Sequence, residues 1–388
     1  MIRSFFSLSI LSFFLLSCTL AKNSEDELVL GAERTHSYLT KIMDKNVGLL
    51  INHTSMVGDA HLVDFLLQKN IKIKKIFAPE HGFRGIADAG EMVDDNVDPN
   101  TGIPVISIYG KNKKPSSEML TGLDVVIFDI QDVGTRFYTY ISSMHYMMEA
   151  CAENEVKMFV FDRPNPNGHF VDGPILKPEF KSFVGMHPIP VVHGLTVGEL
   201  AKMINGEGWL EGGLKCDLEV VSMENYAHSD RYPLPVKPSP NLPNDQAINL
   251  YPSLCFFEGT KMSVGRGTRF PFQVVGYPDQ KFGEFSFTPK SIDGMAKHPK
   301  LEGQECYGVD LRQVKRLNRL DLSYVIDFYK KWNGGESFFT KYFNTLAGTD
   351  ELRKQIESGM SEEAIRQTWQ SDLDAYKKLK LKYLLYED

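Results

Sequence analysis

The chain has 388 residues, more than one hydrophobic core usually serves, so two packed domains are expected. Hydrophobic residues make up 42% and charged residues 24%, which are ordinary globular values. The formal net charge is -7 and no basic block offsets it, which argues against a nucleic-acid partner.

The N-terminus predicts export. Arg3 precedes an apolar run over residues 10–16 that is too short to span a membrane. The run ends at Leu15-Leu16-Ser17-Cys18, which has the form of a lipobox and predicts that Cys18 is acylated after cleavage. An ordinary signal peptide is the alternative, and it would also export the protein. Residues 1–23 are therefore expected to be signal peptide, lipobox and tether. Since no later segment is apolar enough to span the bilayer, the protein is expected to be anchored to a membrane through lipid alone, in the periplasm or at the cell surface.

The first half alternates strand and helix patterns. Short runs rich in Val, Ile and Phe, typical of buried strands, occupy residues 47–52, 73–78, 103–109, 124–129, 157–162 and 217–221. Amphipathic stretches over residues 61–69 and 138–154 predict helices, and a capping box of Thr196 and Glu199 begins another over 196–205. This alternation predicts a parallel sheet with helices on both faces. No G-x-G-x-x-G follows the first strand, so a dinucleotide cofactor is not expected.

The chain changes character at residues 232–243, into which five prolines crowd. Proline at that density excludes regular helix and central strand, so a domain boundary is expected there, between residues 28–230 and 231–388. The second segment contains a strand pattern over 306–314 and ends in helices, the last over 361–383.

Polar clusters follow three of the predicted strands. Ligands of open α/β sheets bind beyond the carboxyl ends of the strands, so these clusters predict a site on one rim. The candidate residues at these strand ends are Glu80, His81, Arg84, Glu91, Asp129, Gln131, Asp132, Arg136, Tyr138, Asp162, Arg163 and Asn165.

Each cluster also has a structural explanation. Asp129 is equally typical of a helix cap or turn. Asp162 and Arg163 can form a local ion pair, and a lone histidine such as His81 is more often structural. Glu91 can lie on a solvated loop. The grouping of three clusters favours an active site over coincidence.

Glu80 is the strongest single candidate. It follows a proline and leaves an apolar strand for a glycine-flanked loop, where partial desolvation would suit a general acid. Glu91 lies eleven residues further on, across a loop that can fold back. Two facing carboxyl groups are the usual equipment for hydrolysis of a glycosidic bond.

The second segment adds four candidates: Asn241 in the proline-rich stretch, then Glu258, Arg266 and Arg269. The two arginines can hold a carboxylate by bidentate hydrogen bonds. The alternative is a packed loop in which they pair with Glu258 or Asp279.

The cysteines beyond Cys18 are widely spaced. Cys151, Cys216, Cys255 and Cys306 include no C-x-x-C pair, so a zinc site is not expected. Each lies in an apolar run, which predicts buried free thiols, with one disulfide as the alternative.

Long motifs in order along the chain resemble the exo-β-N-acetylmuramidase family. They are PEHGFRG with AGE (79–85 and 89–91), FDIQDVGTRFYTY (128–140), FDRPNPNG (161–168), DGP (172–174), HGLTVGELA (193–201), PSPNLP (238–243) and FEGTKMSVGRGTRFPF (257–272). The resemblance runs from about residue 47 to the C-terminus.

The resemblance implies a Rossmann-like domain and a smaller C-terminal α+β domain, with the active site in the cleft between them. It implies release of N-acetylmuramic acid from the non-reducing ends of peptidoglycan fragments, without a cofactor. Glu80 matches the family's acid/base glutamate and Glu91 a partner. Alternatively the acetamido oxygen of the sugar attacks the anomeric carbon, oriented by Asp129 or Asp132.

The expected substrate fits the candidates. N-acetylmuramic acid carries a carboxylate, for which the candidate cations are Arg84, Arg136, Arg266 and Arg269. Its apolar faces stack on aromatic rings, and the aromatic residues beside the polar clusters are Phe83, Tyr138, Tyr140, Phe257 and Phe272.

Two other functions are compatible with parts of the pattern. Asp129, Asp132, His81 and Asp162 can form an oxygen-rich metal site of a metal-dependent hydrolase. A lipoprotein that binds glycans without cleaving them is the other, although a pure binder has no need of a carboxyl pair.

Overall fold

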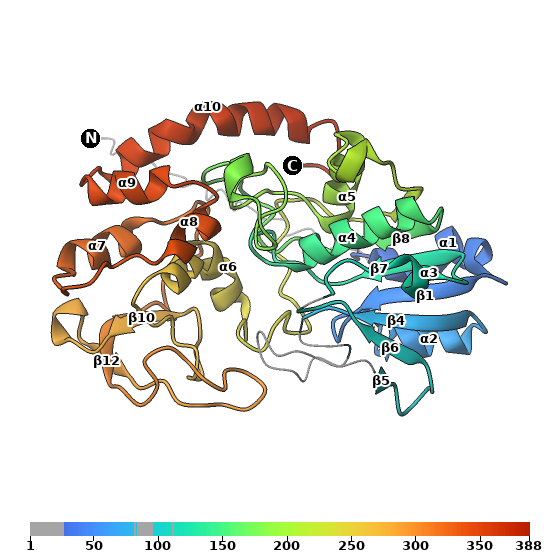
Figure 1. Cartoon of the computed structure of the whole chain (residues 1–388), viewed down its shortest axis with the longest axis horizontal. Coiled ribbons are helices and arrows are strands. Elements are labelled where there is room, and N and C mark those ends of the chain that lie inside the picture. The colour runs from blue at the N-terminus through green and yellow to red at the C-terminus, as the bar shows by residue number, and fades with distance from the viewer. Residues whose placement is uncertain (1–26, 81–82, 84–95, 111) are drawn as a thin grey trace, which may run out of the picture.

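The computed structural model describes residues 27–80, 83, 96–110 and 112–388 (Figure 1). Cys18, His81, Arg84 and Glu91 lie outside these residues, so the predictions made for them stay predictions.

The described strands are β1 (Asn46–Ile51), β2 (Met56–Val57), β3 (Ala60–His61), β4 (Lys72–Ala78), β5 (Asn96–Val97), β6 (Pro104–Ser107), β7 (Val125–Asp129), β8 (Lys157–Phe161), β9 (Leu218–Val221), β10 (Val274–Tyr277), β11 (Phe285–Phe287) and β12 (Cys306–Asp310). The described α-helices are α1 (Thr35–Ile42), α2 (Leu62–Gln68), α3 (Ser117–Leu120), α4 (Tyr140–Glu153), α5 (Val197–Gly206), α6 (Asp245–Leu254), α7 (Ser323–Lys331), α8 (Lys341–Ala347), α9 (Glu351–Glu357) and α10 (Glu362–Lys380). Short 3-10 helices are η2 (Gly31–Glu33), η3 (Pro178–Phe180), η4 (Glu211–Gly213), η5 (Cys255–Gly259) and η6 (Gln280–Phe282).

The main sheet has the order β5-β6-β4-β1-β7-β8-β9 among the described residues, and every pairing except β5 with β6 is parallel. Counted in chain order, the parallel strands run 3-2-1-4-5-6, the doubly wound order of Rossmann-like sheets. The predicted fold class is confirmed. The strand order reverses between β1 and β7, which makes their carboxyl ends the topological switch point.

The two faces of the sheet pack on different helices. Along β1, Leu49 and Ile51 contribute to the core that contains α1 and α2, while Leu50 contributes to the core that contains α4 and α5. This alternation is the period of two expected for a strand buried on both sides. The six parallel strands begin and end within two residues of the predicted ones, whereas β12 ends four residues before the end of the predicted strand over 306–314. The capping box of Thr196 and Glu199 is also present at α5.

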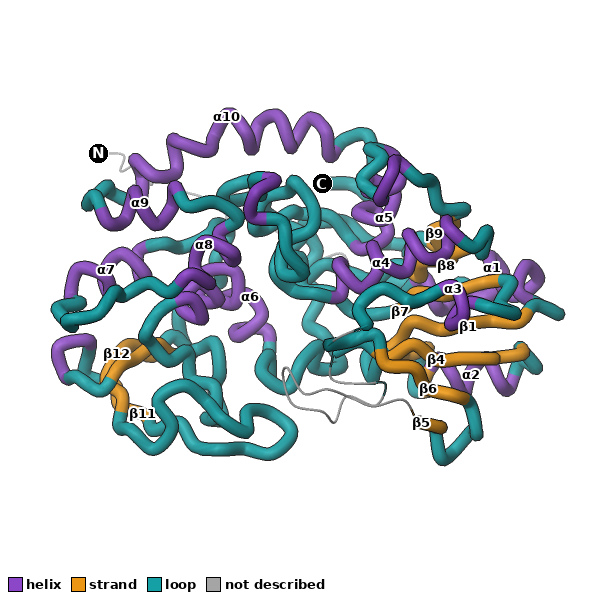
Figure 2. Tube along the Cα trace, viewed as in Figure 1, coloured by secondary structure: helices purple, strands orange, loops and turns teal. Residues whose placement is uncertain are grey.

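The C-terminal part contains a three-stranded antiparallel sheet of order β10-β12-β11 together with helices α6 to α9 (Figure 2). It is an α+β unit, as predicted. No helix among the described residues is long and apolar enough to cross a membrane. Cys151, Cys216, Cys255 and Cys306 are buried free thiols, so the disulfide alternative does not hold.

The two parts share one hydrophobic core. A single cluster of buried residues joins Met144 of α4 to Phe256 of η5 and Phe343 of α8. Helix α10 then returns across the first part, where the Tyr376 hydroxyl donates to the carbonyl of His193 at 2.8 Å. The boundary at residue 231 stays a prediction, and the chain beyond it contributes to both halves.

Candidate active site

The carboxyl ends of three adjacent strands form the rim of the candidate site. Asn52 follows β1, Asp132 lies three residues beyond β7, and Glu80 lies two residues beyond β4. Since β4, β1 and β7 are neighbours in the sheet, these side chains originate side by side at the switch point. Ligands of doubly wound sheets bind in the crevice at this position.

Glu80 lines a cavity of about 300 Å³ between the two parts of the chain. The residues that line it are Glu80, Tyr109, Lys113, Phe137, Tyr138, Thr139, Phe183, Val184, Ser239, Asn241, Leu242, Tyr251, Cys255, Glu258, Arg266, Phe272, Tyr342 and Leu346. The cleft expected between the domains is therefore present, and Glu80 faces it from the sheet.

Hydroxyl groups hold the Glu80 carboxylate. The Tyr109 hydroxyl donates to Oε1 at 3.0 Å, and the Thr139 hydroxyl donates to Oε2 at 3.3 Å. Burial raises the pKa of Tyr109, and the negative charge of Glu80 raises it further, so the phenol remains a donor at neutral pH. The two hydroxyls fix the orientation of a carboxyl group that faces the cavity.

The opposite wall carries an ion pair. Arg266 Nε donates to Glu258 Oε1 at 3.2 Å, and its guanidinium carbon lies 4.9 Å from the centre of the Phe272 ring. The predicted alternative, in which Arg266 pairs with Glu258, is thus observed, and both side chains still line the cavity. Arg269, by contrast, is exposed and does not line it.

Asp129 and Arg163 form a buried pair that does not line the cavity. Arg163 Nε and one terminal nitrogen donate to the two oxygens of Asp129, at 2.6 and 2.9 Å. Asp129 was expected to be a catalytic group, a cap or a turn residue. Its carboxylate instead pairs with Arg163. Because this pair is buried and does not line the cavity, Asp129 is not positioned to orient a substrate there.

Asp162 holds chain segments together. Its oxygens accept from the hydroxyls of Thr196 at 2.7 Å and Tyr386 at 2.6 Å, and from the backbone N–H of Gly198 at 2.8 Å. The ion pair of Asp162 with Arg163, given as the structural alternative, is absent from the described contacts, since Arg163 pairs with Asp129. The substrate-binding role expected of both residues is not supported by their positions.

Arg136 is fully buried and does not reach the cavity. Its guanidinium donates to the carbonyls of Pro174, Ile189, Leu346 and Ala347 at 2.7–3.0 Å. The last two belong to the C-terminal end of α8, where a cation is favourable. Arg136 therefore fixes α8 to the first half of the chain, and its position does not support the expectation that it binds substrate.

Buried polar groups lie behind the cavity wall. Asp132 Oδ1 has no hydrogen-bond partner among the described residues, whereas the Asn52 side chain interacts with the Tyr140 hydroxyl. Burial raises the pKa of Asp132 to about 7. The Tyr140 ring is in edge contact with Tyr138, which lines the cavity, at 5.0 Å between centroids. Buried polar atoms without a partner are uncommon, and Asp132 Oδ1 is one that lies near the site.

The remaining predicted residues divide between the cavity and the scaffold. Tyr138 and Asn241 line the cavity, and Asn241 Oδ1 is another buried acceptor without a partner. Gln131 donates to the carbonyls of Asp132 and Pro164, and Asn165 donates to the carbonyl of Leu195, so both shape loops. Among the predicted aromatic residues only Tyr138 and Phe272 line the cavity, and Phe83 packs on His61 in the core.

Sequence reasoning missed several lining residues. Tyr109 and Lys113 follow β6, a parallel strand next to β4, whereas the three predicted polar clusters follow other strands. Applying the same rim argument to that strand would have found Tyr109. Phe183 and Tyr342 come from an irregular loop and from α8, and no local pattern indicates that they reach the site.

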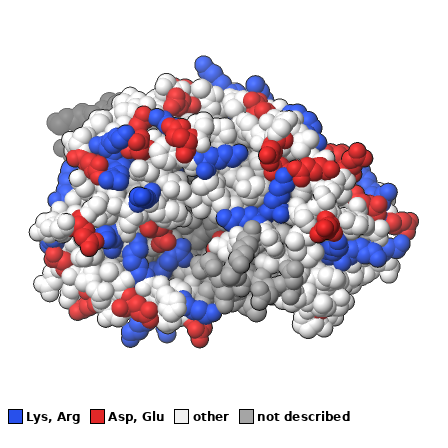
Figure 3. Space-filling model, viewed as in Figure 1, with Lys and Arg blue, Asp and Glu red and all other residues white. Residues whose placement is uncertain are grey.

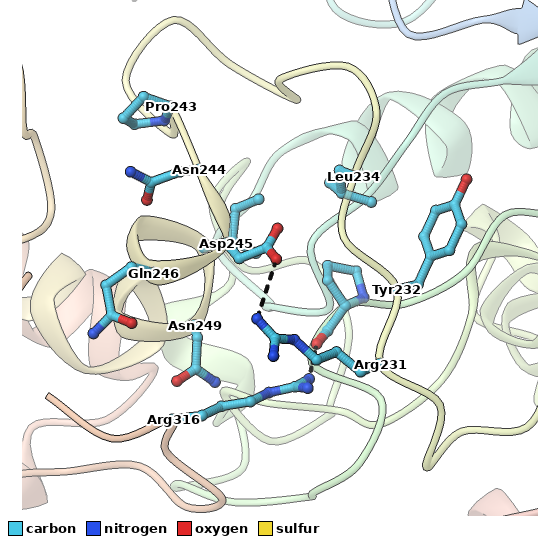
Figure 4. A pocket seen from close by; sticks show the side chains of 11 residues that line it. Arg231, Tyr232, Leu234, Pro243, Asn244, Asp245, Gln246, Asn249 and Arg316 are labelled. Atoms are coloured by element: carbon cyan, nitrogen blue, oxygen red, sulfur yellow. Dashed lines mark hydrogen bonds and ion pairs between the residues drawn. The ribbon is translucent and has the colours of Figure 1, made fainter. Parts of the chain in front are cut away.

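A second cavity of about 490 Å³ lies on the proline-rich side of α6 (Figure 4). Arg231 and Arg316 enter it, but Arg231 lies 3.7 Å from Asp245 and Arg316 donates to the carbonyl of Pro166. It is the larger of the two, yet none of the strand-end carboxyl groups lines it. The smaller cavity around Glu80 is therefore the better candidate for catalysis.

The described residues contain no group of three or more His, Cys, Asp or Glu side chains that could hold a metal ion. Asp129 and Asp162, two members of the alternative metal set, are held by Arg163 and by hydroxyl donors respectively. On the face that Figure 3 shows, basic and acidic side chains are interspersed.

Comparison with known protein families shows which family the chain belongs to. The model of "Exo-beta-N-acetylmuramidase NamZ, N-terminal" matches residues 47–246, and that of its C-terminal domain matches residues 249–386. The chain belongs to the exo-β-N-acetylmuramidase NamZ family. The resemblance seen in the motifs is confirmed over almost all of the described chain.

Similar proteins agree with this assignment. The chain is 40% identical over 374 residues to the peptidoglycan β-N-acetylmuramidase NamZ of Bacillus subtilis strain 168, covering 90% of this chain and 89% of that protein. Crystal structures of two DUF1343 family proteins from Bacteroides fragilis NCTC 9343 are also similar. One is 46% identical with a TM-score of 0.86 and the other 29% identical with a TM-score of 0.80, each covering 93% of this chain and 99% of that chain.

Proposed function

We propose that this member of the NamZ family is an exo-acting glycoside hydrolase that releases N-acetylmuramic acid from the non-reducing ends of peptidoglycan fragments. The observation that carries the proposal is Glu80, whose carboxylate faces a cavity built by both halves of the chain and is oriented by Tyr109 and Thr139. The B. subtilis relative, named a peptidoglycan β-N-acetylmuramidase, supports the same activity.

The size of the cavity supports exo action. A volume of about 300 Å³ is at the small end of ligand pockets, which suits one terminal sugar better than a continuous glycan strand. Tyr138, Phe272 and Tyr342 supply aromatic surface on which the apolar faces of a sugar can stack. We propose that the terminal residue enters this cavity and that the rest of the fragment extends out of it.

Glu80 acts as the general acid. Its proton passes to the glycosidic oxygen as the bond from that oxygen to the anomeric carbon breaks, and the developing oxocarbenium ion is captured at the anomeric carbon. The nucleophile is a water that Glu91 activates, the carboxylate of Glu91 itself, or the acetamido oxygen of the sugar. After water has added, the products are free N-acetylmuramic acid and a shortened fragment.

Asp132 supports the acetamido route. Of the two aspartates expected to orient this group, Asp129 is engaged by Arg163, while Asp132 has an oxygen without a partner beside the site. Asn241 lines the cavity, and its Oδ1 is a further buried acceptor without a partner, the kind of group that suits the amide N–H of an N-acetyl group.

We also propose that the protein is an exported lipoprotein anchored through Cys18. The lipobox pattern at residues 15–18 supports this, as does the expected substrate, because peptidoglycan fragments occur in the envelope.

The test is hydrolysis of a chromogenic β-N-acetylmuramic acid glycoside by the chain without residues 1–23, with the β-N-acetylglucosamine glycoside in parallel. We expect release from the muramic substrate and a loss of about 10²- to 10⁴-fold in kcat for Glu80→Gln, the usual contribution of a general acid.

Glu258→Gln is the matched control, because it alters another carboxyl group in the same cavity whose partner is Arg266. Its loss should be at least tenfold smaller than that of Glu80→Gln. Equal losses would contradict the assignment of Glu80. Retention of cell-wall material without any turnover would support a glycan-binding protein, and activity abolished by EDTA would support the metal-dependent hydrolase.

A further inference from the structure

The charged side chains that line the cavity differ in whether they have a partner of opposite charge. Arg266 is paired with Glu258 at 3.2 Å, so these two charges largely cancel. Lys113 lines the same cavity, is half-buried, and has no acidic partner in the described part of the chain. Lys113 is therefore a positive charge at the cavity for which the described residues supply no counter-ion.

Lys113 is held in position by an aromatic surface. Its Nζ lies 4.4 Å from the centre of the Phe183 ring, which also lines the cavity. Phe183 in turn stacks on Tyr146 of α4, with ring planes 10° apart and centroids 6.2 Å apart. A cation over a fixed ring is oriented without losing its capacity to donate hydrogen bonds. The ammonium group is thus preorganised for an anion that enters the cavity.

Lys113 also belongs to the segment that orients Glu80. Tyr109, which donates to Glu80, lies four residues earlier in the turn after β6. An anionic substituent bound by Lys113 would therefore have a fixed relation to the carboxyl group of Glu80, which protonates the glycosidic oxygen. A cation here would also offset the negative charge that an acidic ligand brings to the cavity.

We propose that Lys113 is the specificity-determining residue that binds the lactyl carboxylate of N-acetylmuramic acid. The inference rests on the proposed function and goes beyond it, because it says how the cavity distinguishes an acidic N-acetylhexosamine from a neutral one. Arg266 contributes less to this distinction, since Glu258 already neutralises it.

The test compares two ligands in the wild type and in three variants. One ligand is the chromogenic β-N-acetylmuramic acid glycoside, and the other is the same glycoside with the carboxylate converted to a carboxamide, which removes the charge and retains the shape. Lys113→Met retains an apolar stem on Phe183 and removes only the ammonium group. Lys114→Met is the matched control, because Lys114 pairs with Glu149 and Glu153 and does not line the cavity.

The wild type and Lys114→Met should prefer the acid over the carboxamide by about 10- to 100-fold in kcat/KM, the value of a hydrogen bond to a charged group. Lys113→Met should process the two ligands about equally, with most of its loss in KM. Lys113→Arg should restore part of the preference. A Lys113→Met variant that retains the wild-type preference overturns the inference.

A binding measurement tests the role of Lys113 independently of the proposed hydrolysis. Calorimetric titration of the wild type and of Lys113→Met with free N-acetylmuramic acid and with its carboxamide does not require turnover. If the wild type binds the acid more tightly and Lys113→Met does not, the inference holds even where no glycoside is cleaved. If both proteins bind the two sugars equally, the inference fails even where hydrolysis is observed.

Discussion

Replacement of Arg136 by methionine tests whether this residue stabilises the fold, as the structure indicates. The side chain is fully buried and donates to four carbonyl oxygens, two of them at the end of α8. Hydrogen bonds from a charged donor contribute about 1.5–3 kcal/mol each, and the buried guanidinium has a desolvation cost of several kcal/mol that offsets about half of their sum. We therefore expect a loss of about 3–5 kcal/mol in the free energy of unfolding.

The assay is urea unfolding followed by tryptophan fluorescence, with Arg269→Met as the control. Arg269 is exposed and outside the cavity, so its replacement should change the free energy of unfolding by less than about 0.5 kcal/mol. At a temperature where Arg136→Met remains folded, its KM for the muramic glycoside should equal that of the wild type. A loss of stability below 1 kcal/mol together with a raised KM would refute the structural role and restore the substrate-binding one.

Three further changes have defined outcomes. Tyr109→Phe removes a hydrogen bond to Glu80 and should lower kcat about 10-fold or more in the glycoside assay, with a thermal midpoint within a few degrees of the wild type; unchanged kcat would contradict the orienting role. Burial raises the pKa of Asp132 to about 7 from 3.8. Between about pH 4 and pH 7 the folded protein therefore holds a proton that the unfolded chain has already lost. The free energy of unfolding should therefore fall as pH rises through this window, by at most about 1.4 kcal/mol per pH unit from this group, and Asp132→Asn should remove that part of the slope in urea titrations at several pH values. Cys18→Ala should abolish incorporation of labelled palmitate and release the protein from the membrane fraction of cells; labelling that persists would show that the lipobox prediction is wrong.

The fold was predictable where hydrophobic patterning is strong. β1, β7 and β8 are buried on both faces, so their sequences are continuous apolar runs bounded by polar residues. α5 was predictable because Thr196 and Glu199 form a capping box. The hydrophobic core shared by the two parts was not predictable, because Phe256 and Phe343 meet Met144 through contacts distant in sequence that no local period encodes.

The position of the candidate site was predictable, but most of the residues that line it were not. Parallel strands end at the same edge, so polar residues after β4 and β7 had to gather there, and Glu80 does line the cavity. Which charged residues turn toward the cavity depends on pairings across the fold. Arg163 lies 34 residues from Asp129, and Arg136 lies 210 residues from Leu346, so neither partner could be inferred from spacing.

One physical rule explains why the sequence left open whether a charged residue at a strand end is structural or functional. A fully buried charge is costly unless it is paired or hydrogen-bonded, so a buried arginine or aspartate at a strand end must be given partners by the scaffold. Asp129, Asp162 and Arg136 have such partners within the scaffold, which leaves them less available to a substrate. A charge that serves a ligand has to remain available at a solvent-filled cavity, as Lys113 and Glu80 do. In this fold, therefore, the most completely satisfied strand-end charges are the ones least suited to act on the substrate.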